Sequence, residues 1–251
     1  MTGANWETKP DGKPGWQQFF LAAGYNTYVS DAVERGRSGW SRFPEIYKGE
    51  PLFRTKREAW ELFRFGPAGS WSGEAAQRRP FEDQQFPLEA FDQFAKQMVP
   101  RWVTNDAATQ AAYDALVKRV GPCILVVHSQ SGKFGYTAAL NNPDLVKALI
   151  VVEPSGAPNP EKVEAARIKG VPQLVIWGDY LDRVPFWTNL LRANERWRDA
   201  VTAAGGEIEW LDLPEVGVRG NSHMLMMDHN SDEVAQLIHA WIGKQGFWDT
   251  R

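Results

Sequence analysis

Apolar and polar residues alternate along this chain in a pattern that becomes regular only after residue 100. From there, short apolar runs are separated by longer mixed stretches, which is typical of buried parallel strands joined by helices. The pattern predicts strands at 123–128, 147–153, 173–178 and 207–213, and helices at 105–120, 131–141, 160–168, 187–203 and 232–242. The last helix is expected to begin with a capping box formed by Asn230 and Glu233. Such alternation indicates an α/β fold with a mostly parallel sheet and helices on both faces.

The first hundred residues show this alternation of strands and helices less clearly. Their pattern predicts a helix, a strand and two short helical pieces, at 15–23, 25–33, 56–65 and 88–98. Gly24 would end the first helix, because glycine readily adopts the left-handed conformation found there. The stretch between the strand and residue 100 is rich in Pro, Gly, Arg, Trp and Phe. We therefore expect one domain spanning residues 1–251, with residues 39–100 as a lid or cap insertion.

Composition narrows the classes of partner. The 251 residues carry a net charge of −3 with scattered basic residues, which argues against nucleic acid and anionic membrane partners. No apolar run approaches the roughly 18 residues that span a bilayer. The first residues lack the basic and apolar regions of a signal peptide, so the sequence as written predicts a cytoplasmic protein, whereas a start farther upstream would allow a secreted or periplasmic one. The single cysteine, Cys123, predicts a buried inert thiol.

The clearest chemical signal is the end of the first regular strand. Its apolar run stops at Ser129, which is flanked by His128 and Gln130 and followed by small residues and an Ala-rich helix. Strand, sharp turn and helix form a nucleophile elbow, which exposes a serine hydroxyl and leaves the next backbone N–H free to stabilise an oxyanion. We predict Ser129 as the nucleophile and Gln130 as the source of that N–H. The alternative is a strand-to-helix turn that merely contains a serine.

A serine hydroxyl needs a base at neutral pH, and four histidines compete for that role. His223 lies in a Gly-Asn-Ser-His loop beyond the last strand, from which it can reach across the sheet edge, so we predict it as the base. His128 points to the face opposite Ser129, because side chains alternate along a strand, and is expected to pack or bind a loop. His239 and His229 are expected at the surface.

The acid that orients the base is contested between Glu153 and Asp182. Either choice gives the chain order Ser, acid, His of the α/β-hydrolase triad. Glu153 ends the strand next to the nucleophile strand, where its extra methylene extends its reach. A glutamate closing an apolar strand loses hydration, so we expect it to have a bonding partner. With Glu153 as the acid, Asp179 and Asp182 would be loop carboxylates that cap the helix near Pro185.

With these residues in place, the chain resembles an α/β-hydrolase over essentially its whole length. The segment from Asp31 to Ser38 resembles the turn after the family's fourth strand, with Glu34 where glycine is usual. Residues 127–132 resemble the family's Gly-His-Ser-Gln-Gly-Gly elbow, with Val127 in place of the first glycine. A small branch of bacterial esterases is similar in three separated motifs, Trp6-Glu7-Thr8 to Gly15-Trp16, His128-Ser129-Gln130-Ser131-Gly132 and Gly220-Asn221-Ser222-His223-Met224. That branch takes its acid from the strand after the nucleophile, which favours Glu153.

The resemblance also implies an incomplete beginning. An α/β-hydrolase carries about three strands before its first helix, and the loop after the third donates one oxyanion N–H. This chain starts inside what would be that loop, so we expect the N-terminal strands and one oxyanion donor to be missing. An exposed sheet edge would then favour aggregation or a compensating homodimer.

The resulting hypothesis is a cofactor-independent and metal-free carboxylic ester hydrolase that acts through an acyl-enzyme on small apolar or aromatic esters. Aromatic residues early in the insertion would either line the pocket for such a group or pack the insertion, namely Trp40, Phe43, Phe53, Trp60, Phe63, Phe65 and Trp71. A first alternative is a truncated, non-catalytic scaffold that retains a ligand pocket. A second is haloperoxidase, lyase or C–C hydrolase chemistry on the same fold, because fold and triad do not fix the reaction.

Overall fold

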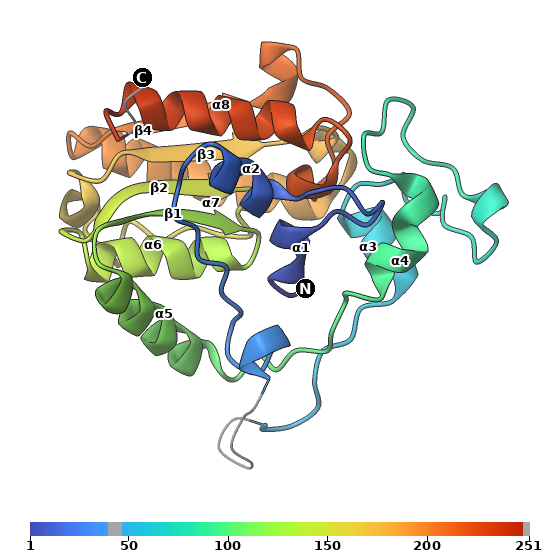
Figure 1. Ribbon diagram of the computed structural model, residues 1–251, viewed down its shortest axis with the longest axis horizontal. Helices are drawn as coiled ribbons and strands as arrows, with labels where there is room; N and C mark the ends of the chain where they lie inside the picture. The colour runs from blue at the N-terminus through green and yellow to red at the C-terminus, as the bar shows by residue number, and fades with distance from the viewer. Residues whose placement is uncertain (40–46, 248–251) are drawn as a thin grey trace. The chain divides into compact units, whose positions relative to one another are not determined.

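The chain folds into two units in the computed structural model, which describes residues 1–39 and 47–247 (Figure 1). The first unit contains Met1–Thr109 and Gly220–Trp241, and the second contains Gln110–Arg219 and the residues after Trp241. The candidate site residues are divided between them. Ser129, Gln130 and Glu153 belong to the second unit, and His223 belongs to the first.

A four-stranded parallel sheet in the order β1-β2-β3-β4 forms the centre of the second unit (Figure 1). Its strands are β1 (Cys123–His128), β2 (Val146–Val152), β3 (Gln173–Trp177) and β4 (Ile208–Asp212). The register pairs His128 with Val152 and Val152 with Ile176, so the carboxyl ends of neighbouring strands are aligned at one edge. The predicted parallel sheet and α/β fold class are confirmed.

The helices of the second unit follow the predicted pattern with one exception. They are α5 (Asp106–Val120), whose first turn belongs to the other unit, α6 (Ser131–Asn141) and α7 (Pro185–Ala203), with 3-10 helices η4 (Ala165–Ile168), η5 (Leu181–Arg183) and η6 (Leu213–Val216). The predicted helix at 160–168 is wrong. The N–H groups of Lys162 and Val163 both donate to the carbonyl of Asn159. The Asn159 side chain accepts from the N–H of Glu161, so the segment forms a turn before η4.

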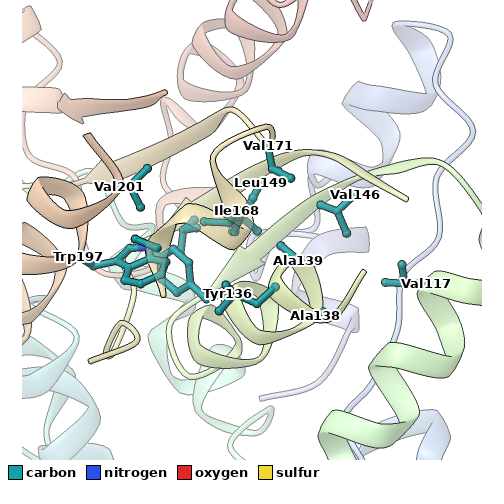
Figure 2. Packing of buried hydrophobic residues seen from close by; sticks show 13 residues of the cluster. Val117, Tyr136, Ala138, Ala139, Val146, Leu149, Ile168, Val171, Trp197 and Val201 are labelled. Atoms are coloured by element: carbon teal, nitrogen blue, oxygen red, sulfur yellow. The ribbon is translucent and has the colours of Figure 1, made fainter. Parts of the chain in front are cut away.

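One face of the sheet packs on α6 and α7. Figure 2 shows this core, in which β2, α6 and α7 contribute buried side chains that include Leu149, Tyr136, Ala139, Trp197 and Val201. Ile150 and Val152 alternate with Leu149 along β2 and are also fully buried. The strand is therefore buried on both faces, as its unbroken apolar sequence predicted.

Short helices joined by turns form the first unit. They are α1 (Ala4–Glu7), α2 (Trp16–Ala22), α3 (Lys56–Leu62), α4 (Phe91–Ala95) and most of α8 (Ser231–Lys244), with 3-10 helices η1 (Gly36–Ser38), η2 (Ala75–Gln77), η3 (Leu88–Ala90) and η7 (Leu225–Met227). The helical pieces predicted around 56–65 and 88–98 are present but shorter. At the end of α2, Gly24 has a φ of 92°, and the N–H of Tyr25 donates to the carbonyl of Phe20 at 3.0 Å, which confirms the predicted helix end.

The strand predicted at 25–33 is wrong. Exposure does alternate from Tyr25 to Asp31, but the segment pairs with no strand among the described residues. The Tyr25 hydroxyl lies 2.8 Å from Nδ1 of His239, and the carboxylate of Asp31 accepts the N–H groups of Gly3 and Arg37. Side-chain contacts hold this extended segment, so periodicity predicted its conformation but not its pairing.

Candidate active site

Ser129 occupies the turn between β1 and α6. Its φ of 55° lies in the left-handed region, where a residue with a side chain is strained. Its N–H donates to the carbonyl of Val152 at 3.0 Å, and its own carbonyl accepts the N–H groups of Gly132 at 2.9 Å and Ser155 at 3.1 Å. The neighbouring strand and the first turn of α6 thus fix the strained conformation, and the strand, sharp turn and helix predicted from the sequence are present.

The valine found where the elbow motif has glycine is accommodated by a glycine on the helix. A β-carbon at Gly135 of α6 would lie 2.8 and 2.9 Å from the two methyl carbons of Val127. A β-carbon at Gly132 would lie 3.0 Å from the side chain of Pro154. The close approach of strand and helix is therefore possible with valine on the strand, because the facing residue on the helix has no side chain.

Gln130 directly precedes α6, with φ −56° and ψ −32°. Its backbone N–H therefore lies at the positive end of the α6 dipole, where an anion is stabilised. The side chain of Gln130 makes no capping bond to the helix. The backbone is thus the part of this residue that suits an oxyanion.

Glu153 follows β2 directly and is fully buried, with a strained φ of 50°. Its Oε1 accepts the N–H of Gly178, at the end of β3, at 2.5 Å. Its own N–H donates to the carbonyl of Ile176 at 2.9 Å. The bonding partner expected for this carboxylate is therefore a backbone amide of the neighbouring strand end, which fixes one of its two oxygens.

The two aspartates after β3 have different surroundings. The side chain of Asp182 is 81% exposed and forms a surface ion pair with Arg183 at 3.4 Å. Oδ1 of Asp179 accepts the N–H of the next residue, Tyr180, at 2.8 Å. Helix α7 begins after Val184 with no side-chain cap, so the expected capping by Asp179 or Asp182 is wrong.

Strained residues and carboxylates gather at the carboxyl edge of the sheet. Ser129, Glu153 and Tyr180 follow three neighbouring strands and all have positive φ. At the end of β4, desolvation raises the pKa of Asp212 to about 6, with repulsion from nearby carboxylates as a further cause, the largest contribution coming from Glu215. Backbone strain and shifted pKa values both concentrate at functional sites. Sequence reasoning missed Tyr180 and Asp212, since neither belongs to a motif.

Cys123, at the start of β1, is partly buried and packs against the core of the second unit. Burial raises the pKa of its thiol, which keeps it protonated at neutral pH. The thiol is thus less buried than predicted, while its raised pKa is what an unreactive thiol would have.

His223 belongs to the first unit, within residues 220–229, which we call the histidine loop. Its side chain is almost completely buried. Its N–H donates to the carbonyl of Phe63, at the end of α3, at 2.9 Å. The rings of His223 and Phe63 lie 5.2 Å apart between centroids. The end of α3 therefore holds the predicted base through both backbone and ring contacts.

The two other histidines in this part of the chain differ in exposure. His229 is exposed, as predicted, whereas His239 is half-buried beside Tyr25. The N–H of Glu233, which a capping box would join to the side chain of Asn230, donates to the main-chain carbonyl of Asn230 at 3.0 Å. The side-chain amide of Asn230 forms two hydrogen bonds with that of Asn221, at 2.7 and 3.1 Å. This pair ties the start of α8 to the histidine loop.

Most aromatic side chains between residues 60 and 94 pack against one another. Ring contacts connect Trp60, Phe63, Phe65, Trp71, Phe86, Phe91 and Phe94. Trp60 and Phe65 are almost completely buried, so the packing interpretation fits them better than a role in lining a pocket. Phe53 is 69% exposed, and Trp40 and Phe43 lie outside the described residues.

Within residues 1–39 and 47–247, no group of three or more His, Cys, Asp or Glu side chains is arranged to hold a metal ion. In the same ranges, no helix combines the length and apolar character needed to cross a membrane.

Known proteins resemble this chain over nearly its full length. A bacterial esterase of known structure is 37% identical, with a TM-score of 0.84, and the match covers 98% of this chain and 78% of the esterase. A probable secreted lipase, phiG, from Fungal sp. (strain ATCC 74256) is 27% identical over 306 residues, covering 98% of this chain and 79% of the lipase. No family model matches the chain.

Proposed function

This chain belongs to the α/β-hydrolase superfamily and is a hydrolase of the esterase and lipase type, and on that premise we propose that it cleaves carboxylic esters through an acyl-enzyme on Ser129. The observation that carries the proposal is the strained turn at Ser129, between a buried strand and a helix. Such strain is retained where the surrounding structure enforces it, and an exposed serine hydroxyl is what this turn achieves in hydrolases.

In the proposed reaction, His223 takes the proton of the Ser129 hydroxyl as its oxygen attacks the ester carbonyl carbon. The backbone N–H of Gln130 stabilises the oxyanion of the tetrahedral intermediate. The bond to the alcohol oxygen then breaks, and His223 gives its proton to the departing alcohol. Water, activated by the same imidazole, attacks the acyl-enzyme and releases the carboxylic acid and free Ser129.

Glu153 is the proposed acid that orients the imidazole of His223. Two observations support it over Asp182. Glu153 is fully buried and anchored by the N–H of Gly178, whereas Asp182 is largely exposed and paired with Arg183. A fixed, desolvated carboxylate stabilises an imidazolium more strongly than a hydrated surface one.

The substrate proposed is a small ester with an apolar or aromatic group. The names of the esterase and lipase relatives support the ester bond as the one that is cleaved. A non-catalytic scaffold is not favoured by these relatives. We retain residues 39–100 as the proposed insertion of the fold, with residues 40–46 outside the described part of the chain.

The test is pre-steady-state hydrolysis of p-nitrophenyl butyrate by the wild type and two serine variants. An acyl-enzyme predicts a burst of p-nitrophenol stoichiometric with the enzyme, provided that deacylation is slower than acylation. Ser129→Ala should lose the burst and turnover to background, while Ser131→Ala, two residues farther along the same turn, should keep both. Full activity in Ser129→Ala would contradict the proposed function.

A further inference from the structure

One buried carboxylate holds the backbone on both sides of His223. Oδ2 of Asp228 accepts the N–H of Ser222 at 2.9 Å and the side-chain amide of Asn221 at 3.0 Å. Its Oδ1 accepts the Ser222 hydroxyl at 2.7 Å, and the same hydroxyl oxygen accepts the N–H of Met224 at 2.9 Å. The residues before His223 are thus held directly by Asp228, and the residue after it is held through Ser222.

The insertion holds the same loop from outside. Besides the bond from His223 to the carbonyl of Phe63, the N–H of Gln85 donates to the carbonyl of Gly220 at 2.8 Å. The carbonyl of Gln85 accepts the N–H of His229 at 2.7 Å. A β-carbon at Gly220 would collide with the backbone carbonyl of Asp83, so the insertion can approach only because this residue is glycine. Both ends of the histidine loop are therefore anchored.

The side chain of Asp228 is fully buried, which is uncommon for a carboxylate. Burial raises its pKa to about 7, although the three hydrogen bonds and the charge of Arg64 act in the opposite direction. Arg64 is itself fully buried and strained, with a φ of 59°, and directly follows Phe63. Burying a carboxylate is unfavourable unless it is well bonded, and here its two oxygens accept three hydrogen bonds from the histidine loop.

We propose that Asp228 is a positioning residue for His223, fixing the loop backbone so that the imidazole keeps one orientation. This inference rests on the proposed function, in which His223 is the general base. A base must meet the proton that it accepts within hydrogen-bond distance, so a displaced loop slows the chemical step. Substrate binding does not use the imidazole in this way. Loss of Asp228 should therefore lower kcat and leave KM nearly unchanged.

The experiment measures kcat, KM and the urea midpoint for Asp228→Ala, Asp228→Asn and Ser222→Ala. Asp228→Ala should lower kcat about 100-fold, which is the effect of a displacement of roughly 1 Å in a catalytic group. Asp228→Asn keeps an acceptor for the N–H of Ser222 and the amide of Asn221, so it should stay within about tenfold of the wild type. Ser222→Ala is the smaller change and tests the bond to Met224 if Asp228→Ala does not fold.

Asp114→Ala is the matched control, since Asp114 also accepts three side-chain amides, from Gln110, Asn141 and Asn142. This carboxylate lies in the second unit and should affect stability but not kcat. Equal losses of kcat in Asp114→Ala and the loop variants would overturn the inference, as would wild-type kcat in folded Ser222→Ala and Asp228→Ala. Ser129→Ala is assayed beside them. If it is inactive while the loop variants are fully active, the inference alone fails, and if it is active, the proposed function fails.

Discussion

The two units position their candidate catalytic residues by different physical means. In the second unit, Ser129 and Glu153 follow neighbouring strands, and backbone bonds between the strand ends fix them. In the first unit, His223 lies in a loop whose regular structure is limited to the short helix η7, and buried side chains such as Asp228 hold it. In a sheet with a repeating strand and helix pattern, the strands themselves place the residues that follow them. An irregular loop is placed by individual contacts with distant residues. The second kind of placement is more sensitive to single substitutions.

The largest effect is expected when each of the two candidate acids in the second unit is replaced by its amide. Removing the acid that orients a catalytic imidazole lowers kcat by about four orders of magnitude. Glu153→Gln should show a loss of this kind, and Asp182→Asn should stay close to the wild type because its side chain is 81% exposed. Steady-state kinetics on p-nitrophenyl butyrate gives both values. If Asp182→Asn lost more activity than Glu153→Gln, the acid would be Asp182, and the glutamate at the end of β2 would not orient the imidazole.

A smaller effect tests how closely strand and helix must approach in the second unit. Gly135→Val would place methyl groups against those of Val127, and overpacking of this kind lowers the free energy of unfolding by about 1–3 kcal/mol. Val127→Ala in the same chain removes the opposing methyl groups and should recover most of the loss. Gly243→Val, where a β-carbon meets open space, controls for the helix propensity of valine. Urea unfolding measures all four chains, and an unrecovered double variant would contradict the compensation.

A still smaller effect is expected in how the free energy of unfolding depends on pH, where one carboxyl in each unit contributes. Burial raises the pKa of Asp228 above its unfolded value of 3.8, so between about pH 4 and 7 the folded state binds more protons than the unfolded state. This carboxyl therefore makes stability fall as pH rises through that window, by at most about 1.4 kcal/mol per pH unit. Asp228→Asn should flatten the decline in urea midpoints.

Asp212 in the second unit should act in the same direction, but only up to about pH 6. Its half-buried side chain is better screened by water, so Asp212→Asn should change the slope less than Asp228→Asn does. Carboxylates with lowered pKa values, such as Asp31 and Asp92, act below pH 4 and lie outside this window. An identical slope in the wild type and Asp228→Asn would contradict the assigned origin of the decline.

The sequence predicted the second unit well because its strands and helices repeat one pattern. All four strands and the turn at Ser129 follow from apolar runs and the residues that end them. The compensation of Val127 by Gly135 could not be predicted, because it depends on how closely a helix packs on a strand. Periodicity also failed at 25–33, since alternating exposure there reflects side-chain contacts in a segment without a partner strand among the described residues.

The first unit shows why the histidine loop was only partly predictable. The Gly-Asn-Ser-His sequence identified His223, but the carboxylate that holds it comes five residues later and lies outside that motif. The bond from His223 to Phe63 joins residues far apart in the chain. Contacts of this range depend on the folded chain around α3, so neither spacing nor periodicity in the sequence reveals them.

The most direct test of the central claim is the site at which a fluorophosphonate probe attaches. The probe phosphonylates an activated serine, so peptide mass spectrometry of the labelled wild type should find the adduct on Ser129 alone, and Ser129→Ala should remain unlabelled. His223→Ala should label far more slowly, since the hydroxyl has lost its proposed base. Attachment at Ser131, or undiminished labelling of Ser129→Ala, would contradict the assignment of the nucleophile.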